Sequence, residues 1–241
     1  MAAAFAWGVI SASSLVLGGG IALCFRLSLR AIGLVMAFGA GVLISAVAFN
    51  LVEEAFAKGA GHTPVVLGMF AGCLVFFGGD LLIDRAGGGR RKSARGSGDS
   101  PLAIVLGTVL DGIPESLVVG LTIFESGKVG AAYLVAVFIS DIAESLSSSV
   151  GLIARGWRAS RILLLWTMIA VVAGVSSLAG YSLFDGVSTN VVGFVLAFAG
   201  GAILTMLADT MMPEAFEHGG KLAGVVTTLG FVVALLIDQL A

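Results

Sequence analysis

The sequence has little charge and leaves almost no room for a soluble domain. Asp, Glu, Lys and Arg make up 12% of its 241 residues, and 58% are apolar, whereas about 25% of the residues of a soluble domain are charged. The mean hydropathy is +1.08. These values exclude an ordinary soluble protein, indicate an integral membrane protein and give no sign of a nucleic-acid partner.

Cysteine is also scarce. Cys24 and Cys73 lie in separate apolar runs and show no Cys-x-x-Cys spacing. This pattern predicts two small apolar side chains and argues against a disulfide framework or a thiolate metal site.

Long apolar runs are what the sequence does contain, and eight of them approach or exceed the roughly 20 residues that a helix needs to cross a bilayer. The first run lacks a basic leader, which predicts a retained helix and not a cleaved signal peptide. The predicted spans cover residues 4–24, 31–56, 63–84, 101–124, 129–153, 160–182, 188–213 and 220–239. We therefore predict an all-α, polytopic membrane protein with a single transmembrane domain over residues 1–241.

Positive charge is distributed unevenly between the predicted loops. If the N-terminus is extracytoplasmic, all of the 13 Lys and Arg residues except Lys58 and Lys128 fall on the cytoplasmic side, as the positive-inside rule favours. The polar segment 85–100 is then a cytoplasmic loop. We expect a multi-pass protein of the cell membrane, the inner membrane in a bacterium, with both termini extracytoplasmic.

Two parts of the chain resemble each other. Residues 38–56 align without a gap on residues 198–216, and the sequence Leu-Leu-Ile-Asp recurs at 81–84 and 235–238. Since the second and seventh spans should run in opposite directions, this pattern predicts an inverted repeat, a layout typical of secondary transporters. We predict a 3+2+3 arrangement, with repeats at 1–84 and 160–241 around a central pair of helices at 101–153.

Four carboxylates interrupt the central pair, in GTVLDGIPESLVVG (107–120) and VAVFISDIAESLSSSVG (135–151). Asp111 and Glu115 share one helical face, as do Asp141, Glu144 and Ser140. Each carboxylate in a bilayer costs about 2.5–3.5 kcal/mol on insertion scales, so four require a cation, protons or a water-filled path. Oxygen ligands in this number predict a site for a divalent cation. Protonated acids that merely join the helices are the alternative.

At these residues the sequence resembles the ZIP (ZRT/IRT-like) family of divalent metal transporters. Residues 111–116 and 140–145 fall on its two metal-binding motifs, and residues 206–220 resemble span seven of bacterial members. The resemblance implies that Glu115 and Glu144 bridge a two-metal centre, that Asp111 replaces a histidine ligand and that Asp141 keeps an acidic ligand position. It also implies a homodimer.

This sequence departs from the family pattern at several positions. Both motif histidines are absent, Gly112 lacks the asparagine side chain and Ala143 replaces the second proline. The second metal position therefore has fewer ligands. The expected substrate is Zn²⁺, Mn²⁺ or Fe²⁺, because loss of imidazole favours harder ions while Zn²⁺ also accepts carboxylate oxygen.

Polar residues in the repeat copies are candidates for a cation pathway. Glu54 lies near the outer end of the second span, and Glu214 and His218 lie near the inner end of the seventh. Asn50 and Asp209 occupy nearly matching positions in the two copies, and both are expected to face inward.

We predict a divalent metal transporter that imports its cation into the cytoplasm, and not an enzyme. A non-transporting metal or proton sensor or scaffold remains an alternative because the family histidines are missing. An intramembrane aspartyl protease is disfavoured, since neither Tyr133 nor Tyr181 precedes an aspartate and Phe77 interrupts the required glycine pattern before Asp80.

Overall fold

The eight-span prediction is confirmed. The computed structural model describes residues 1–58, 61–83, 85, 101–127, 130–184 and 186–240, and these residues form helices and turns with no strand. Eight of the helices are long and apolar enough to cross a membrane. Except for Arg85, the predicted cytoplasmic loop 85–100 lies outside the described residues, as does Lys128.

Two of the spans are not uniform α-helices. The elements in chain order are α1 (Ala2–Cys24), α2 (Leu29–Ala46), η1 (Val47–Val52), α3 (Glu53–Ala57), α4 (His62–Ile83), α5 (Pro101–Ser126), α6 (Ala131–Ala154), α7 (Ala159–Ser182), α8 (Thr189–Met206), η3 (Leu207–Met211), α9 (Met212–Gly219) and α10 (Leu222–Leu240). The second span runs through α2, η1 and α3, and the seventh through α8, η3 and α9. Both η1 and η3 are π-helical, which the sequence did not predict. Such segments are rare and often mark functional sites.

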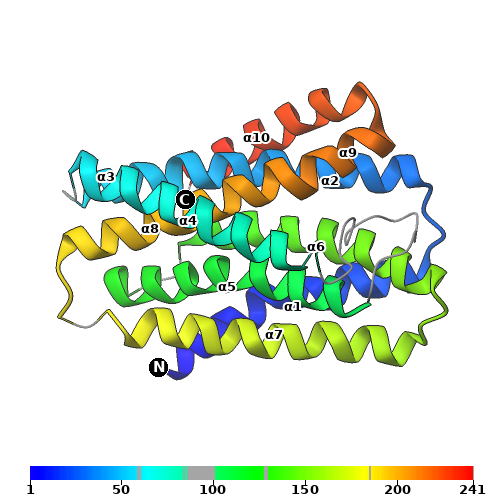
Figure 1. Cartoon of the computed structure of the whole chain (residues 1–241), viewed down its shortest axis with the longest axis horizontal. Coiled ribbons are helices and arrows are strands. Elements are labelled where there is room, and N and C mark those ends of the chain that lie inside the picture. The colour runs from blue at the N-terminus through cyan, green and yellow to red at the C-terminus, as the bar shows by residue number, and fades with distance from the viewer. Residues whose placement is uncertain (59–60, 84, 86–100, 128–129, 185, 241) are drawn as a thin grey trace.

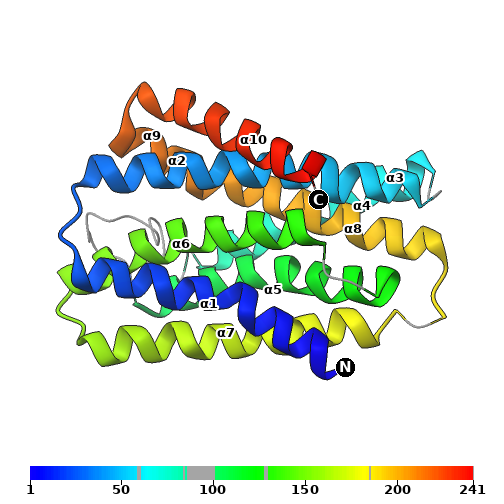
Figure 2. The ribbon, with the colours of Figure 1, turned by 180° about the vertical axis from the view of Figure 1, so that it is seen from behind.

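The helices pack as two groups that lie against each other (Figures 1 and 2). In one group α1 packs on α6 and α7, and α5 packs on α7. In the other group α2 packs on α10 and α8 packs on α4. Contacts of α2 with α6 and of α5 with α8 join the two groups. The central helices α5 and α6 therefore pack with α1 and α7, the first helix of each predicted repeat.

Glycines allow the closest approaches within the second group. A Cβ atom on Gly41 of α2 would collide with the backbone carbonyl of Thr227 in α10, and one on Gly201 of α8 with that of Met69 in α4. Small residues commonly let membrane helices approach to backbone contact, where dispersion forces stabilise the pair. The glycine-rich composition of these spans thus follows from their packing.

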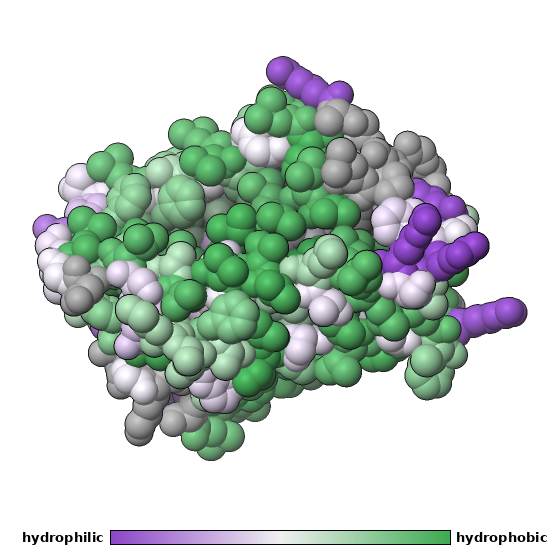
Figure 3. Space-filling model, turned by 90° about the horizontal axis from the view of Figure 1, so that it is seen from below, coloured by the Kyte–Doolittle hydropathy of each residue, from purple (hydrophilic) through white to green (hydrophobic). Residues whose placement is uncertain are grey.

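The surface separates into an apolar middle and a charged end. Figure 3 shows hydrophobic side chains over most of one face and hydrophilic side chains gathered mainly at one end. Exposed cations lie in the turns from α1 to α2, from α6 to α7 and from α9 to α10, or in the first turn of the helix that follows: Arg26, Arg30, Arg158, Arg161 and Lys221. Because each of these turns follows an odd-numbered span, all three lie at the same end of the bundle.

A valine at Gly72 tests the close packing of α4 on α8. A Cβ atom there would collide with the carbonyl of Phe198, whereas one on Gly78 of the same helix would meet nothing within 4 Å. We expect Gly72→Val to lower stability by about 1–3 kcal/mol through overpacking, and Gly78→Val to cost much less. Thermal unfolding of both variants in detergent measures this difference. Equal melting temperatures would contradict the packing.

Candidate metal centre

The four predicted carboxylates lie inside the helix bundle, in the middle of α5 and α6. The exposed fractions of Asp111, Glu115, Asp141 and Glu144 are 3%, 2%, 6% and 3%. The spans that carry them are otherwise apolar. A buried carboxylate is stable as an ion only when a positive charge or several hydrogen-bond donors lie beside it, so this region is suited to receive a cation.

Three of these carboxylates face one pocket. Glu115 of α5 and Asp141 and Glu144 of α6 line it together with Thr108 and Ser116 of α5. Side chains of α1 and α7 complete the wall with an apolar surface: Ala12, Leu15, Ile169, Val172 and Ala173. The pocket therefore brings acidic and hydroxyl-bearing residues of two helices together against an apolar background, where acidic residues in membrane helices are rare and often functional.

Two other predicted ligands are close in sequence but do not line this pocket. Asp111 and Ser140 are both buried, yet neither contributes to the pocket wall. Nor do any three His, Cys, Asp or Glu side chains in the described part of the chain form a ready-made metal cluster. Coordination in this conformation would therefore use hydroxyl or water oxygen beside the carboxylates.

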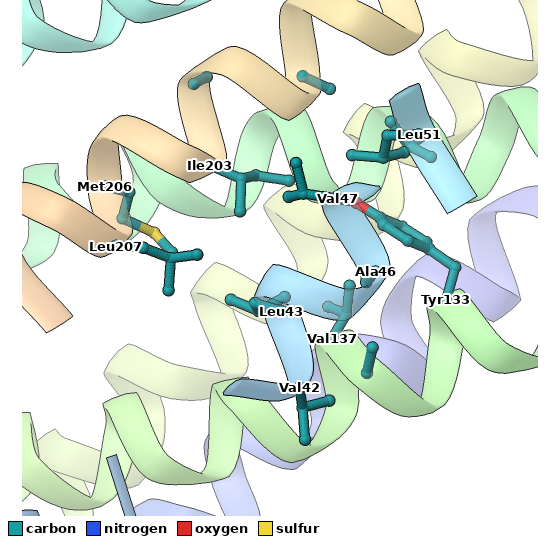
Figure 4. Packing of buried hydrophobic residues seen from close by; sticks show 14 of the residues in the cluster. Val42, Leu43, Ala46, Val47, Leu51, Tyr133, Val137, Ile203, Met206 and Leu207 are labelled. Carbon is teal, nitrogen blue, oxygen red and sulfur yellow. The ribbon is translucent and has the colours of Figure 1, made fainter. Parts of the chain in front are cut away.

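Tyr133 is a neighbour of the carboxylates that sequence reasoning did not assign to the site. It is 2% exposed and lies two helical turns before Asp141 on α6. Its hydroxyl lies 3.4 Å from the backbone carbonyl oxygen of Glu115, a long hydrogen bond. In Figure 4 its ring extends toward Val47 of η1, and Val137 lies near Ala46 of α2. All of these residues belong to one buried apolar cluster, so Tyr133 packs where α6 meets the second span.

A second side chain missed from the sequence comes from α1. Ser14 is fully buried, and its hydroxyl oxygen lies 3.2 Å from Oδ2 of Asp141. A serine inside a long apolar run carries no local signal for such a contact, because the two residues are far apart in the chain. The first span thus belongs to the surroundings of the carboxylates.

A separate polar cluster connects α6 to α9. The Ser147 hydroxyl donates a hydrogen bond of 2.5 Å to Oε1 of Glu214, and Nε2 of His218 lies 3.9 Å from the same oxygen. The side chains of Glu214 and His218 are 7% and 1% exposed. Since Ser147 is three residues after Glu144, the cluster begins one helical turn from the pocket.

The remaining pathway candidates have different surroundings. Asn50 is half-buried and donates a hydrogen bond of 2.6 Å to Oδ1 of Asp238, so it joins η1 to α10. Glu54 is half-buried, and its Oε1 lies 3.7 Å from Nζ of Lys58. Asp209 is exposed on η3, so the prediction that it faces inward is wrong. That prediction came from the near match of Asp209 to Asn50 in the repeat, and such a match does not fix the rotation of either helix.

Comparison with known proteins gives one informative match. No protein-family model matches the chain. Over 145 residues the chain is 31% identical to a protein of Myxococcus xanthus named zinc transporter GufA. The match covers 58% of this chain and 56% of that relative. The aligned part is thus little more than half the length of either protein.

Removing the Ser147 hydroxyl tests the cluster between α6 and α9. We expect Ser147→Ala to lower stability by about 1.5–3 kcal/mol, because a buried carboxylate loses a hydrogen bond. The control is Ser176→Ala, which removes an exposed hydroxyl that bonds only to the Val172 carbonyl of its own helix. Thermal unfolding in detergent compares them. A Ser147→Ala protein as stable as the control would contradict this assignment.

Proposed function

We propose that the protein is a ZIP-like transporter that carries a divalent cation across the membrane. The pocket lined by Glu115, Asp141 and Glu144 carries this proposal. Three nearly unexposed carboxylates in apolar spans are expensive unless a cation or protons neutralise them, and reversible neutralisation by a cation is what a carrier requires. The name of the Myxococcus xanthus relative supports zinc as the cargo. It also favours transport over proteolysis.

In this proposal the cation is the substrate and the central helices hold it. Glu115 and Glu144 are the main ligands, Asp141 contributes a third carboxylate, and Asp111 and Ser140 stay candidates that a rearrangement of α5 and α6 would bring in. Zn²⁺ accepts carboxylate oxygen and binds most sites more tightly than Mn²⁺ or Fe²⁺. The absence of imidazole in the pocket widens the range of ions to include these two.

We further propose that the chain is an inverted 3+2+3 repeat whose two packing groups move relative to each other. Two observations support the repeat. The π segments η1 and η3 begin at aligned positions, Val47 and Leu207. The packing of α2 on α10 is also mirrored by that of α8 on α4. The group of α1, α5, α6 and α7 would carry the cation past the group of α2, α4, α8 and α10.

The proposed direction is import into the cytoplasm, with both termini outside and the protein in the cell inner membrane. The gathering of exposed arginines at one end of the bundle supports this orientation. Ser147, Glu214 and His218 would then lie on the cytoplasmic side of the pocket. They would pass the cation from the pocket toward the cytoplasm. A homodimer is proposed by resemblance to the family alone, and the mass of the purified protein in detergent would test it.

A second candidate function is a sensor or scaffold that binds a cation without transport. The loss of both motif histidines favours it. Such a protein would bind metal at the same pocket but show no uptake.

Metal uptake into proteoliposomes tests transport. We expect Glu115→Gln and Glu144→Gln each to reduce Zn²⁺ uptake at least tenfold, because each removes a buried charge that the cation must meet. The control is Glu53→Gln, an exposed carboxylate on α3, which should leave uptake unchanged. Zn²⁺, Mn²⁺ and Fe²⁺ are compared in parallel.

The outcomes separate the two candidate functions. Uptake unaffected by both substitutions would rule out this pocket as the transport site. Metal binding that depends on Glu115 and Glu144, without uptake by the intact protein, would support the sensor or scaffold.

A further inference from the structure

The first helix approaches the central helix α6 closely enough to share its cation site. A Cβ atom on Gly18 of α1 would collide with the Ser145 hydroxyl and with the backbone carbonyl of Ile142. This contact fixes α1 against the turn of α6 that carries Asp141 and Glu144. Ser14 lies one turn before Gly18 on the same face of α1, which brings its side chain to Asp141.

The Ser14 hydroxyl has two acceptors and only one proton. Its oxygen lies 2.6 Å from the Ser11 carbonyl oxygen in its own helix and 3.2 Å from Oδ2 of Asp141. The shorter contact is the stronger hydrogen bond. Directed to Asp141, the proton makes the 3.2 Å hydrogen bond to Oδ2. Directed to Ser11, it leaves a lone pair of Ser14 Oγ facing the Asp141 carboxylate, and the two oxygens then repel each other unless a cation or a proton of Asp141 lies between them.

We propose that Ser14 Oγ is an oxygen ligand of the transported cation, contributed by α1 together with Asp141 of α6. This inference rests on the proposed function and adds a third helix to the site. The 3.2 Å separation of the two oxygens matches neighbouring ligands on one divalent ion. Oxygens bound about 2.0–2.2 Å from a tetrahedral or octahedral metal lie about 2.8–3.6 Å apart.

The neighbouring chemistry supports this assignment. Ala12 and Leu15 of α1 line the pocket that Asp141 and Glu144 share, so α1 already forms part of its wall. Ser14 lies behind that wall, as Asp111 and Ser140 do, and would reach the cation by the same rearrangement. Serine and threonine hydroxyls coordinate divalent ions in phosphate-binding loops, which establishes the ligand type. A neutral hydroxyl adds a ligand without adding another buried negative charge, and it favours oxygen-preferring ions over soft ones.

Three variants test whether Ser14 binds the cation. Ser14→Ala removes the hydroxyl, and Ser14→Cys replaces it with a softer sulfur of similar shape. Ser13→Ala is the matched control, since the Ser13 hydroxyl bonds the carbonyl of Ile10 in its own helix. Initial uptake rates of Zn²⁺, Mn²⁺ and Cd²⁺ into proteoliposomes give the KM and the maximal rate for each ion, with Glu144→Gln measured alongside. Thermal unfolding confirms that each variant is folded.

We expect Ser14→Ala to raise the KM for Zn²⁺ and Mn²⁺ about threefold to tenfold, the effect of losing one polar interaction. Ser14→Cys should shift the preference from Mn²⁺ toward Cd²⁺, because thiolate sulfur favours soft ions. Ser13→Ala should leave the KM for each ion and the preference among the ions unchanged.

Two results would overturn the assignment. One is an unchanged KM in Ser14→Ala while Glu144→Gln abolishes uptake. The other is an unchanged ion preference in Ser14→Cys, since a hydroxyl that only packs α1 against α6 would affect all ions alike. If Glu144→Gln leaves uptake intact, the pocket is not the transport site. The proposed function then fails, and this inference fails with it.

Discussion

The burial of ionisable oxygen in a medium without water constrains the rest of this structure. Glu115, Asp141 and Glu144 cannot be stable as ions in apolar spans unless donors or cations surround them. One neighbour is a hydroxyl group, since Ser14 Oγ lies 3.2 Å from Oδ2 of Asp141. The three carboxylates come from two helices and line one pocket, so the protein concentrates the cost of burying acidic groups in one place.

Close helix packing makes that arrangement possible. Gly18 lets α1 touch α6, and Gly41 and Gly201 let pairs of helices meet backbone to backbone in the other group. Interfaces of this kind stabilise a bundle by dispersion, without the hydrophobic effect that drives packing in water. They also divide the molecule into two groups whose mutual contacts, made chiefly by α2 with α6 and by α5 with α8, run alongside the carboxylates.

The sequence was most informative where one residue reports on its own surroundings. Hydropathy alone locates the eight spans, because every lipid-facing position must be apolar, and a carboxylate inside such a run stands out at once. Ser14 and Tyr133 could not be found this way. A serine or tyrosine costs little in a membrane helix, and its partner lies on another helix whose rotation no local pattern specifies. The inward orientation of Asp209 was wrongly predicted for a related reason, since a near match to Asn50 in the repeat does not specify how a helix is rotated.

The two π segments also determine how the ends of their spans are oriented. A π turn accommodates one more residue than an α turn, and each residue of an α-helix advances about 100° around the axis. Everything beyond η1 and η3 is therefore rotated by about that angle relative to an unbroken helix. Glu214 lies three residues beyond η3, and its Oε1 accepts the hydrogen bond of Ser147 in this register. If η3 adopted regular α geometry, Glu214 would turn about the helix axis and lose that partner, so the bond between α6 and α9 depends on the π segment.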